Sequence, residues 1–287
     1  MKRIILIASA FIGVIVGAGF ASGQEVLQYF TSFGIMGTFG AVITTAIFAY
    51  VGMMLVWLGS RSKTDSHKKV IHNITGNSVI GRLLGWAIDV VIVFTLFGVG
   101  VVMIAGAGSN LNQQFNVPPV VGTLLMTILI ILAGMLRVDG VVKVIGNITP
   151  FLIIFIVIIS IYSFVTTDTS FGELHKVSDA IPSSLPHWLV AGINYASFNT
   201  AVGASMAIVM GGSEKNPKVA AIGGLVGGIA LGIMIVLSHL AIFMQINNVG
   251  QMDMPMLGIV NNISPILGFI MAIVIFAMIF NTGLGMF

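Results

Sequence analysis

The stretch Gly17-Ala18-Gly19-Phe20-Ala21-Ser22-Gly23-Gln24-Glu25 decides the fold. It places glycines, a serine, an amide and an acid in the middle of an apolar run that extends from about residue 4 to residue 30. Helix-breaking sequence halfway across a membrane persists only where the backbone is buried in protein or lines a watery cavity. The stretch therefore predicts a discontinuous transmembrane helix. Glycine spacing for helix packing alone would not explain why Ser22, Gln24 and Glu25 stand beside the glycines.

The rest of the chain has the composition of a membrane protein. Of its 287 residues, 57% are hydrophobic and 7% are charged, whereas a soluble domain carries about 25% charged residues. The chain has no cysteine, which excludes disulfides, thiol catalysis and thiolate metal sites. The net charge of +3 does not indicate a nucleic-acid partner, because the basic residues lie in the loops between apolar runs. The solvent of this protein is the lipid bilayer.

Eight apolar runs are long enough to cross a hydrocarbon core, which requires roughly 20 helical residues. We expect one all-α, polytopic transmembrane domain over residues 1–287. The last run has no polar stop, so we also expect further C-terminal helices to be missing from this sequence. The expected helices span about residues 4–30, 33–59, 83–107, 117–136, 144–166, 188–211, 218–245 and 265–287.

The distribution of basic residues predicts the orientation. With a cytoplasmic N-terminus and alternating loops, all but one of the 12 Lys and Arg residues face the cytoplasm, and Lys176 is the exception. This is the positive-inside bias. The cytoplasmic set is Lys2, Arg3, Arg61, Lys63, Lys68, Lys69, Arg82, Arg137, Lys143, Lys215 and Lys218.

A second polar stretch, Gly192-Ile193-Asn194-Tyr195-Ala196-Ser197-Phe198-Asn199-Thr200, lies in the sixth run. Its Tyr-Ala-Ser lies 175 residues after the Phe-Ala-Ser of the first run, and the same offset pairs residues 103–108 with residues 278–283. We therefore predict that helices 1 and 6 are both discontinuous and that five spans repeat as five more. An odd number of spans per repeat inverts the second copy across the membrane. The sequence would then end after helix 8 of this 5+5 inverted repeat.

Two features of the seventh run have simpler explanations. Gly224, Gly228 and Gly232 are spaced by four, which favours close helix packing. His239 has no nearby acid in the sequence, so we interpret it as a hydrogen-bonded packing histidine rather than a proton carrier.

The first-helix stretch resembles the signature of YkvI-type bacterial membrane proteins and, more distantly, the Gly-x-Gly motif of amino acid–polyamine–organocation transporters. The resemblance implies a leucine-transporter-like fold in the bacterial cytoplasmic membrane. It also implies a secondary active transporter, a symporter that takes up an amino acid or a similar small zwitterion by alternating access.

The same resemblance implies where the substrate binds. The N–H groups of Ala18, Gly19 and Phe20 would face the substrate carboxylate, because the second half of a broken helix presents free N–H groups with a partial positive charge. Free carbonyls near Asn194 and Tyr195 would accept from the substrate amine. The expected substrate-binding residues are Ala18, Gly19, Phe20, Ser22, Asn194, Tyr195, Ser197 and Asn199.

A sodium ion is the coupling ion that the resemblance implies. Sodium is favoured over a proton because residues 149–152, where some relatives carry a lysine, contain no cation. Glu25 is a candidate for proton or cation coupling, or alternatively a vestibule glutamate bonded to Ser22 or Gln24. The sodium ligands would be the carbonyls of Gly13, Val16 and Met278 and the side-chain oxygens of Asn281 and Thr282.

Two rival functions follow from other features. An intramembrane enzyme requires paired acids, a Ser/His pair or a metal motif, and Glu25, Asp89 and His239 lie in different runs without such spacing. We therefore expect no enzyme. A ligand-sensing subunit that kept the fold and lost transport would retain the same binding site, so the sequence does not separate it from a carrier. No cofactor beyond sodium is expected, and the oligomeric state is not predicted.

Overall fold

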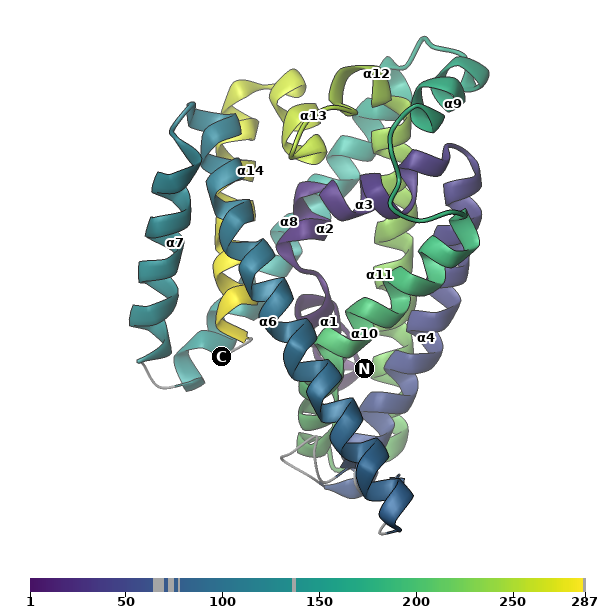
Figure 1. Cartoon of the computed structure of the whole chain (residues 1–287), viewed down its shortest axis with the longest axis vertical. Helices are drawn as coiled ribbons and strands as arrows, with labels where there is room; N and C mark the ends of the chain where they lie inside the picture. Colours follow the sequence, from purple (N-terminus) through teal and green to yellow (C-terminus); the bar gives the residue numbers. More distant parts are fainter. Residues whose placement is uncertain (64–69, 72–74, 77, 136–137, 286–287) are drawn as a thin grey trace. The chain divides into compact units, whose positions relative to one another are not determined.

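The computed structural model describes residues 1–63, 70–71, 75–76, 78–135 and 138–285, which form helices and no strand. The helices coincide closely with the apolar runs, and the largest difference is in the third, which continues to Phe115 (Figure 1). These helices are α1 (Lys2–Ile15), α2 (Ala18–Ser22), α3 (Gln24–Tyr29), α4 (Met36–Ser62), α6 (Val79–Phe115), α7 (Pro119–Gly134), α8 (Val138–Thr166), α10 (Trp188–Ser213), α11 (Pro217–Met244) and α14 (Pro265–Gly285). The short helices η1 (Thr31–Phe33), α9 (Phe171–Asp179), α12 (Ile246–Val249) and α13 (Pro255–Ile263) lie between the apolar runs or at their ends.

The helices have the apolar character that a bilayer requires. Among the described residues, α4, α6 and α11 are each long and apolar enough to cross a membrane, by length and composition. Residues 150–166 of α8 and the bent continuation α9, at 119° to each other, pass the same test as a pair, and α7 and α14 contain shorter apolar helices. Large apolar side chains are exposed along α6, α7 and α8, for example Phe94, Ile131 and Ile161. Lipid, rather than water, suits such surfaces.

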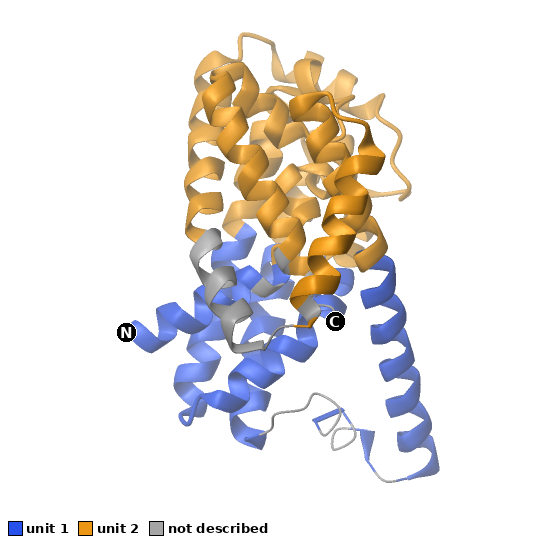
Figure 2. Ribbon diagram, turned by 90° about the vertical axis from the view of Figure 1, so that its left-hand side faces the viewer, with its two compact units in different colours: residues 1–15, 45–99, 196–232 blue, residues 16–44, 100–195, 233–287 orange. Residues whose placement is uncertain are grey.

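The chain divides into two compact units (Figure 2). Unit 1 contains residues 1–15, 45–99 and 196–232, and unit 2 contains residues 16–44, 100–195 and 233–287. The chain passes between the units inside the continuous helices α4, α6, α10 and α11. It also passes between them at the break between α1 and α2, where no helix is continuous. The first helix is therefore shared between the units through irregular backbone.

Close glycine packing joins α4 to α11 in unit 1. A Cβ added at Gly224 or Gly228 would collide with the backbone of α4, at Gly52 and Phe48 respectively. At Gly232 it would collide with the Thr45 side chain. Only glycine permits this separation between the helices. The packing predicted for this stripe is confirmed.

Polar side chains hold the short helices of unit 2. The Gln113 amide pairs with the Met254 backbone, donating to its carbonyl and accepting from its N–H, each at 2.9 Å. His239 is fully buried, and its Nδ1 and Nε2 lie 3.1 and 3.0 Å from the hydroxyls of Thr31 and Thr38. These bonds agree with the interpretation of His239 as a hydrogen-bonded packing residue. They tie α11 to η1 and to the start of α4.

Candidate binding site at the broken first helix

The first helix is interrupted at two points. α1 ends at Ile15 and α2 begins at Ala18, with Gly17 in an extended conformation between them. α2 then ends at Gly23, whose φ of +84° lies in the left-handed region that favours glycine. A Cβ at Gly23 would also lie 2.6 Å from Met256 Cγ. The prediction of a discontinuous first helix is confirmed.

Ser22 braces the turn between α2 and α3. Its hydroxyl donates to the Gly19 carbonyl at 3.1 Å and accepts from the Gln24 N–H at 3.3 Å. The Ser22 side chain is 1% exposed. The structure therefore gives this predicted substrate ligand a role in shaping the break.

Glu25 turns its carboxyl group back onto α2. A Cβ added at Gly19 would collide with Glu25 Oε1, so the glycine leaves the space that the carboxyl occupies. The carboxyl accepts a hydrogen bond from the Tyr195 side chain. Its Oε2 atom is buried and has no hydrogen-bond partner among the described residues. The acid predicted at the break thus lies against α2, with one acceptor unused.

An aromatic cluster surrounds the Tyr195 ring. The ring centroid of Tyr195 lies 5.2 Å from that of Tyr29 and 5.1 Å from that of Phe30, the second pair in an edge arrangement. Tyr195 is 2% exposed. Tyr29 is also close enough to Glu25 for an electrostatic interaction between the two side chains. Aromatic edges and faces at such distances attract each other, so the cluster fixes α3 to α10.

The predicted break in the sixth span is wrong, because α10 is continuous from Trp188 to Ser213. Gly192 serves close packing instead: a Cβ there would lie 2.7 Å from the Gly40 carbonyl oxygen, and the Thr44 hydroxyl donates to the Gly192 carbonyl at 2.8 Å. In a continuous helix each interior carbonyl accepts from the N–H four residues later. The carbonyls of Asn194 and Tyr195 are therefore not free acceptors for a substrate amine.

A polar pocket of ≈ 200 Å³ adjoins the aromatic cluster. Tyr29 belongs to both the cluster and the pocket. The exposed Asn194 also lines the pocket, and it does so from a continuous helix rather than from an unwound backbone. The pocket is lined by Gln28, Tyr29, Ser183, Ser184, Leu185 and Asn194. The sequence did not indicate the contribution of the segment before α10.

The remaining predicted substrate residues of α10 lie in the other unit. Ser197 is exposed and Asn199 is 4% exposed, and both belong to unit 1. Glu25, Tyr29 and Tyr195 belong to unit 2. The cluster described here therefore contains the beginning of the predicted sixth-span stretch only.

α14 packs against α2, where the sodium site was predicted. The Thr282 hydroxyl donates to the Met278 carbonyl at 2.9 Å. A Cβ added at Gly17 would lie 3.7 Å from Thr282 Cγ2 and 4.0 Å from Thr282 Oγ1, so the Thr282 side chain lies beside the break. Val16 is buried beside the break, Gly13 belongs to unit 1, and the Asn281 side chain lies outside the described residues. The Thr282 side chain thus lies next to the first interruption.

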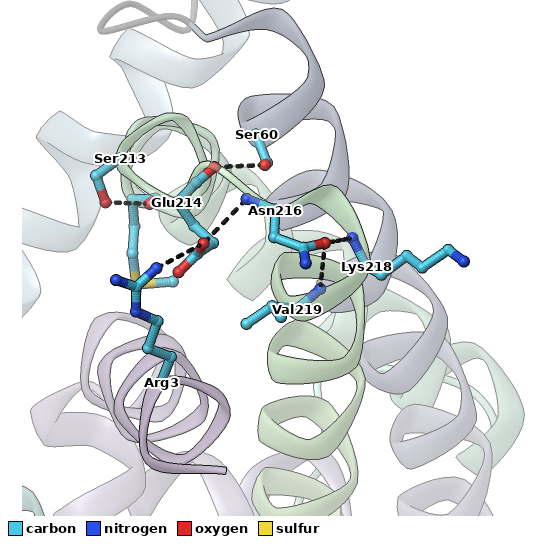
Figure 3. A network of polar contacts seen from close by, with 8 residues as sticks. Arg3, Ser60, Ser213, Glu214, Asn216, Lys218 and Val219 are labelled. Carbon is cyan, nitrogen blue, oxygen red and sulfur yellow. Dashed lines mark hydrogen bonds and ion pairs between the residues drawn. The ribbon is translucent and has the colours of Figure 1, made fainter.

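The sequence did not predict a polar network in unit 1 (Figure 3). Arg3 lies 3.4 Å from Glu214 Oε1, which also accepts from the Asn216 N–H at 2.9 Å. The Ser60 hydroxyl donates to the Glu214 carbonyl. Asn216 in turn caps α11 by accepting from the Lys218 N–H at 3.0 Å. The network joins the start of α1 and the end of α4 to the turn between α10 and α11.

Comparisons with known proteins agree with this fold. No family model matches the chain. Two proteins of Bacillus subtilis (strain 168) are similar to it. The uncharacterized membrane protein YkvI is 29% identical over 280 residues, which cover 97% of this chain and 77% of that protein. The uncharacterized protein YyaD is 24% identical over 282 residues, which cover 98% and 77%.

The solved structures that resemble the chain are transporters. A mutant of the Eremococcus coleocola manganese transporter has a TM-score of 0.63 at 15% identity, over 99% of this chain and 65% of the transporter. The same transporter in complex with an aromatic bis-isothiourea substituted compound has a TM-score of 0.52 at 14% identity, over 99% and 64%. The chain thus spans less than two thirds of the transporter's length. The protein is an all-α, multi-pass membrane protein with the fold of these transporters, and the resemblance to YkvI-type membrane proteins is confirmed over nearly its whole length.

Proposed function

We propose that the protein is a secondary active transporter that couples uptake of an amino acid or a similar small zwitterion to a cation gradient. It would work by alternating access, as a single transmembrane domain of the bacterial cytoplasmic membrane with its N-terminus in the cytoplasm. The observation that carries the proposal is the interrupted first helix, with the Glu25 carboxyl held against it.

A broken helix that carries an acid is energetically costly in a membrane, and such a feature is therefore expected to serve a function. An acid at the centre of a span costs about 3 kcal/mol on insertion scales. The first N–H groups of α2, at Ala18, Gly19 and Phe20, have no partner within the helix. We propose these groups as donors to the substrate carboxylate, with Ser22, Asn194 and Tyr195 as further substrate-binding residues. Glu25 Oε2, which is buried and has no hydrogen-bond partner among the described residues, supports a site for a positively charged group of the same solute.

We propose sodium as the coupling ion. Carbonyl and hydroxyl oxygens are the ligands that hard cations prefer. Met278 and Thr282 would supply one of each, and the position of the Thr282 side chain beside the break supports this assignment. The Val16 carbonyl and the Asn281 side chain would complete the site.

Manganese, which the names of the solved neighbours mention, is not the substrate we propose. The described residues contain no group of three or more His, Cys, Asp or Glu side chains placed to hold a metal ion. Manganese prefers carboxylate, imidazole and water ligands. The cluster beside the break offers one carboxylate and aromatic rings instead.

Uptake into proteoliposomes tests the proposal. The full-length protein is reconstituted, and labelled amino acids are offered with an inward sodium gradient or with potassium replacing sodium. We expect at least one amino acid to accumulate only when the gradient is imposed. Binding without uptake of any amino acid would favour the alternative, a ligand-sensing subunit.

A further inference from the structure

The carboxyl of Glu25 lies against α2, in the space that a side chain at Gly19 would fill. At the same time, the continuity of α10 removes the carbonyls that were expected to receive the substrate's amine. Glu25 Oε2 is a charged-group acceptor in this part of unit 2 that is buried and has no hydrogen-bond partner among the described residues. The charge that this site calls for is therefore positive.

We propose that Glu25, Tyr29 and Tyr195 form the subsite for the ammonium group of an organic solute, which reaches it from the pocket between Gln28 and Asn194. The proposal rests on the transporter function above and names the chemistry of its substrate. An ammonium group has three N–H donors, and Glu25 Oε2 accepts one of them. The two tyrosine rings stabilise the same cation through their faces.

The surroundings favour an organic ammonium over a bare metal cation. Sodium requires several oxygen ligands, as other hard cations do, whereas the side chains that interact with the carboxyl are two tyrosines, each with a single oxygen. The adjoining pocket of ≈ 200 Å³ has room for a small solute, since water in the liquid occupies about 30 Å³ per molecule. Amides of Gln28 and Asn194 and hydroxyls of Ser183 and Ser184 line it and suit the polar remainder of that solute.

The positions of Tyr29 and Tyr195 determine which residue a solute in the pocket contacts first. Tyr29 lines the pocket, whereas Tyr195 is buried behind it and donates to the Glu25 carboxyl. A solute in the pocket therefore meets Tyr29 first and the carboxyl last.

Binding to the purified full-length protein tests the subsite independently of transport. Two triplets of probes separate the charges: L-alanine, ethylamine and propionate, and L-leucine, isoamylamine and isocaproate. Ligand-induced shifts of the thermal unfolding midpoint report binding. We expect the amino acid and the amine of at least one triplet to stabilise the wild type, and the carboxylate not to.

The variant Glu25→Gln should weaken that binding about ten- to hundredfold, which is the effect of losing a hydrogen bond to a charged group. Glu173→Gln, the same chemical change on exposed α9, is the matched control and should bind as the wild type does. Tyr29→Phe should retain binding and Tyr29→Leu should lose it, because phenylalanine preserves the aromatic face. If Glu25→Gln does not fold, Tyr29→Leu and Tyr29→Phe alone decide the matter.

The outcomes separate this subsite from the transporter function. Sodium-driven uptake that Glu25→Gln leaves unchanged would overturn the subsite and keep the transporter. Amine binding that depends on Glu25, without any uptake, would support the subsite and contradict the transporter. Stabilisation by both carboxylates and by neither amine would overturn the subsite, as would no stabilisation by any of the six probes.

Discussion

Glu25 and Gly19 share one space: the carboxyl of Glu25 lies where a side chain at position 19 would be. Gly19 and Glu25 therefore depend on each other: the missing side chain of the glycine leaves room for the carboxyl of the acid. Two turns of broken helix bring the acid back to the glycine, and Ser22 holds the turn between them. This relationship explains why the stretch requires both residue types.

Gly19→Ala should displace the Glu25 carboxyl without removing its charge. The atom in conflict is at the end of a flexible side chain, so we expect the fold to survive. Amine-dependent stabilisation should fall about as much as in Glu25→Gln. Thermal unfolding with and without isoamylamine measures it.

Gly98→Ala is the matched control for that variant. Gly98 lies inside α6, and a Cβ there meets no atom within 4 Å. It should bind isoamylamine as the wild type does. Equal binding by Gly19→Ala and Gly98→Ala would contradict the role given to the shared space.

The glycine contact between α4 and α11 should control stability. Gly228→Ala forces a methyl group onto the Phe48 backbone, which cannot move aside as a side chain can. Overpacking of this kind costs about 1–3 kcal/mol, whereas alanine in an open helical position gains up to about 1 kcal/mol. The unfolding midpoint should therefore fall for Gly228→Ala and hold or rise for Gly98→Ala. The same midpoint in both variants would be inconsistent with the close helix contact.

The network at Glu214 should be asymmetric in energy. Arg3 is 73% exposed and Glu214 is 8% exposed, so solvent screens the ion pair and Arg3→Ala should cost no more than about 1 kcal/mol. Glu214→Ala also removes the acceptor of the Asn216 N–H at the start of α11, and it should cost about 1.5–3 kcal/mol. Unfolding of both variants in detergent compares them. A larger loss for Arg3→Ala would show that the ion pair dominates.

The absence of cysteine makes the orientation directly measurable. Single cysteines at the exposed positions Ser62, at the end of α4, and Ser170, before α9, should react differently with a membrane-impermeant maleimide applied to intact cells. We expect labelling at Ser170→Cys and protection at Ser62→Cys until the cells are opened. The reverse pattern would invert the proposed topology.

The sequence was most informative where one physical requirement dominates. Lipid demands long apolar helices, so the runs predicted helix positions well, and the mixture of glycine and polar residues at 17–25 predicted the first break. The glycines of α11 were predicted to pack because their spacing of four has a single structural use.

The sequence was least informative where the partner of a residue is distant in the chain. In the sequence Gly192 suggests a helix break, but in the structure it packs against Gly40. Tyr195 also suggests part of a break, but in the structure it contacts Glu25 and Tyr29. Composition alone does not distinguish a glycine that breaks a helix from one that packs it. Arg3 and Glu214 are 211 positions apart in the sequence, so no local sequence pattern indicates that they pair.

Sodium dependence of uptake tests the central claim most directly, because it joins the broken helix to coupled transport. The variants are Thr282→Ala at the break and Thr127→Ala in α7, each of which removes a hydroxyl bonded to the carbonyl four residues earlier, at 2.9 and 2.8 Å. Proteoliposomes of the full-length protein should accumulate an amino acid in response to a sodium gradient. Thr282→Ala should need about tenfold more sodium, as expected if the loss of one oxygen ligand costs about 1.4 kcal/mol, and Thr127→Ala should match the wild type. Uptake that ignores sodium in the wild type, or an unchanged sodium response in Thr282→Ala, would contradict the account.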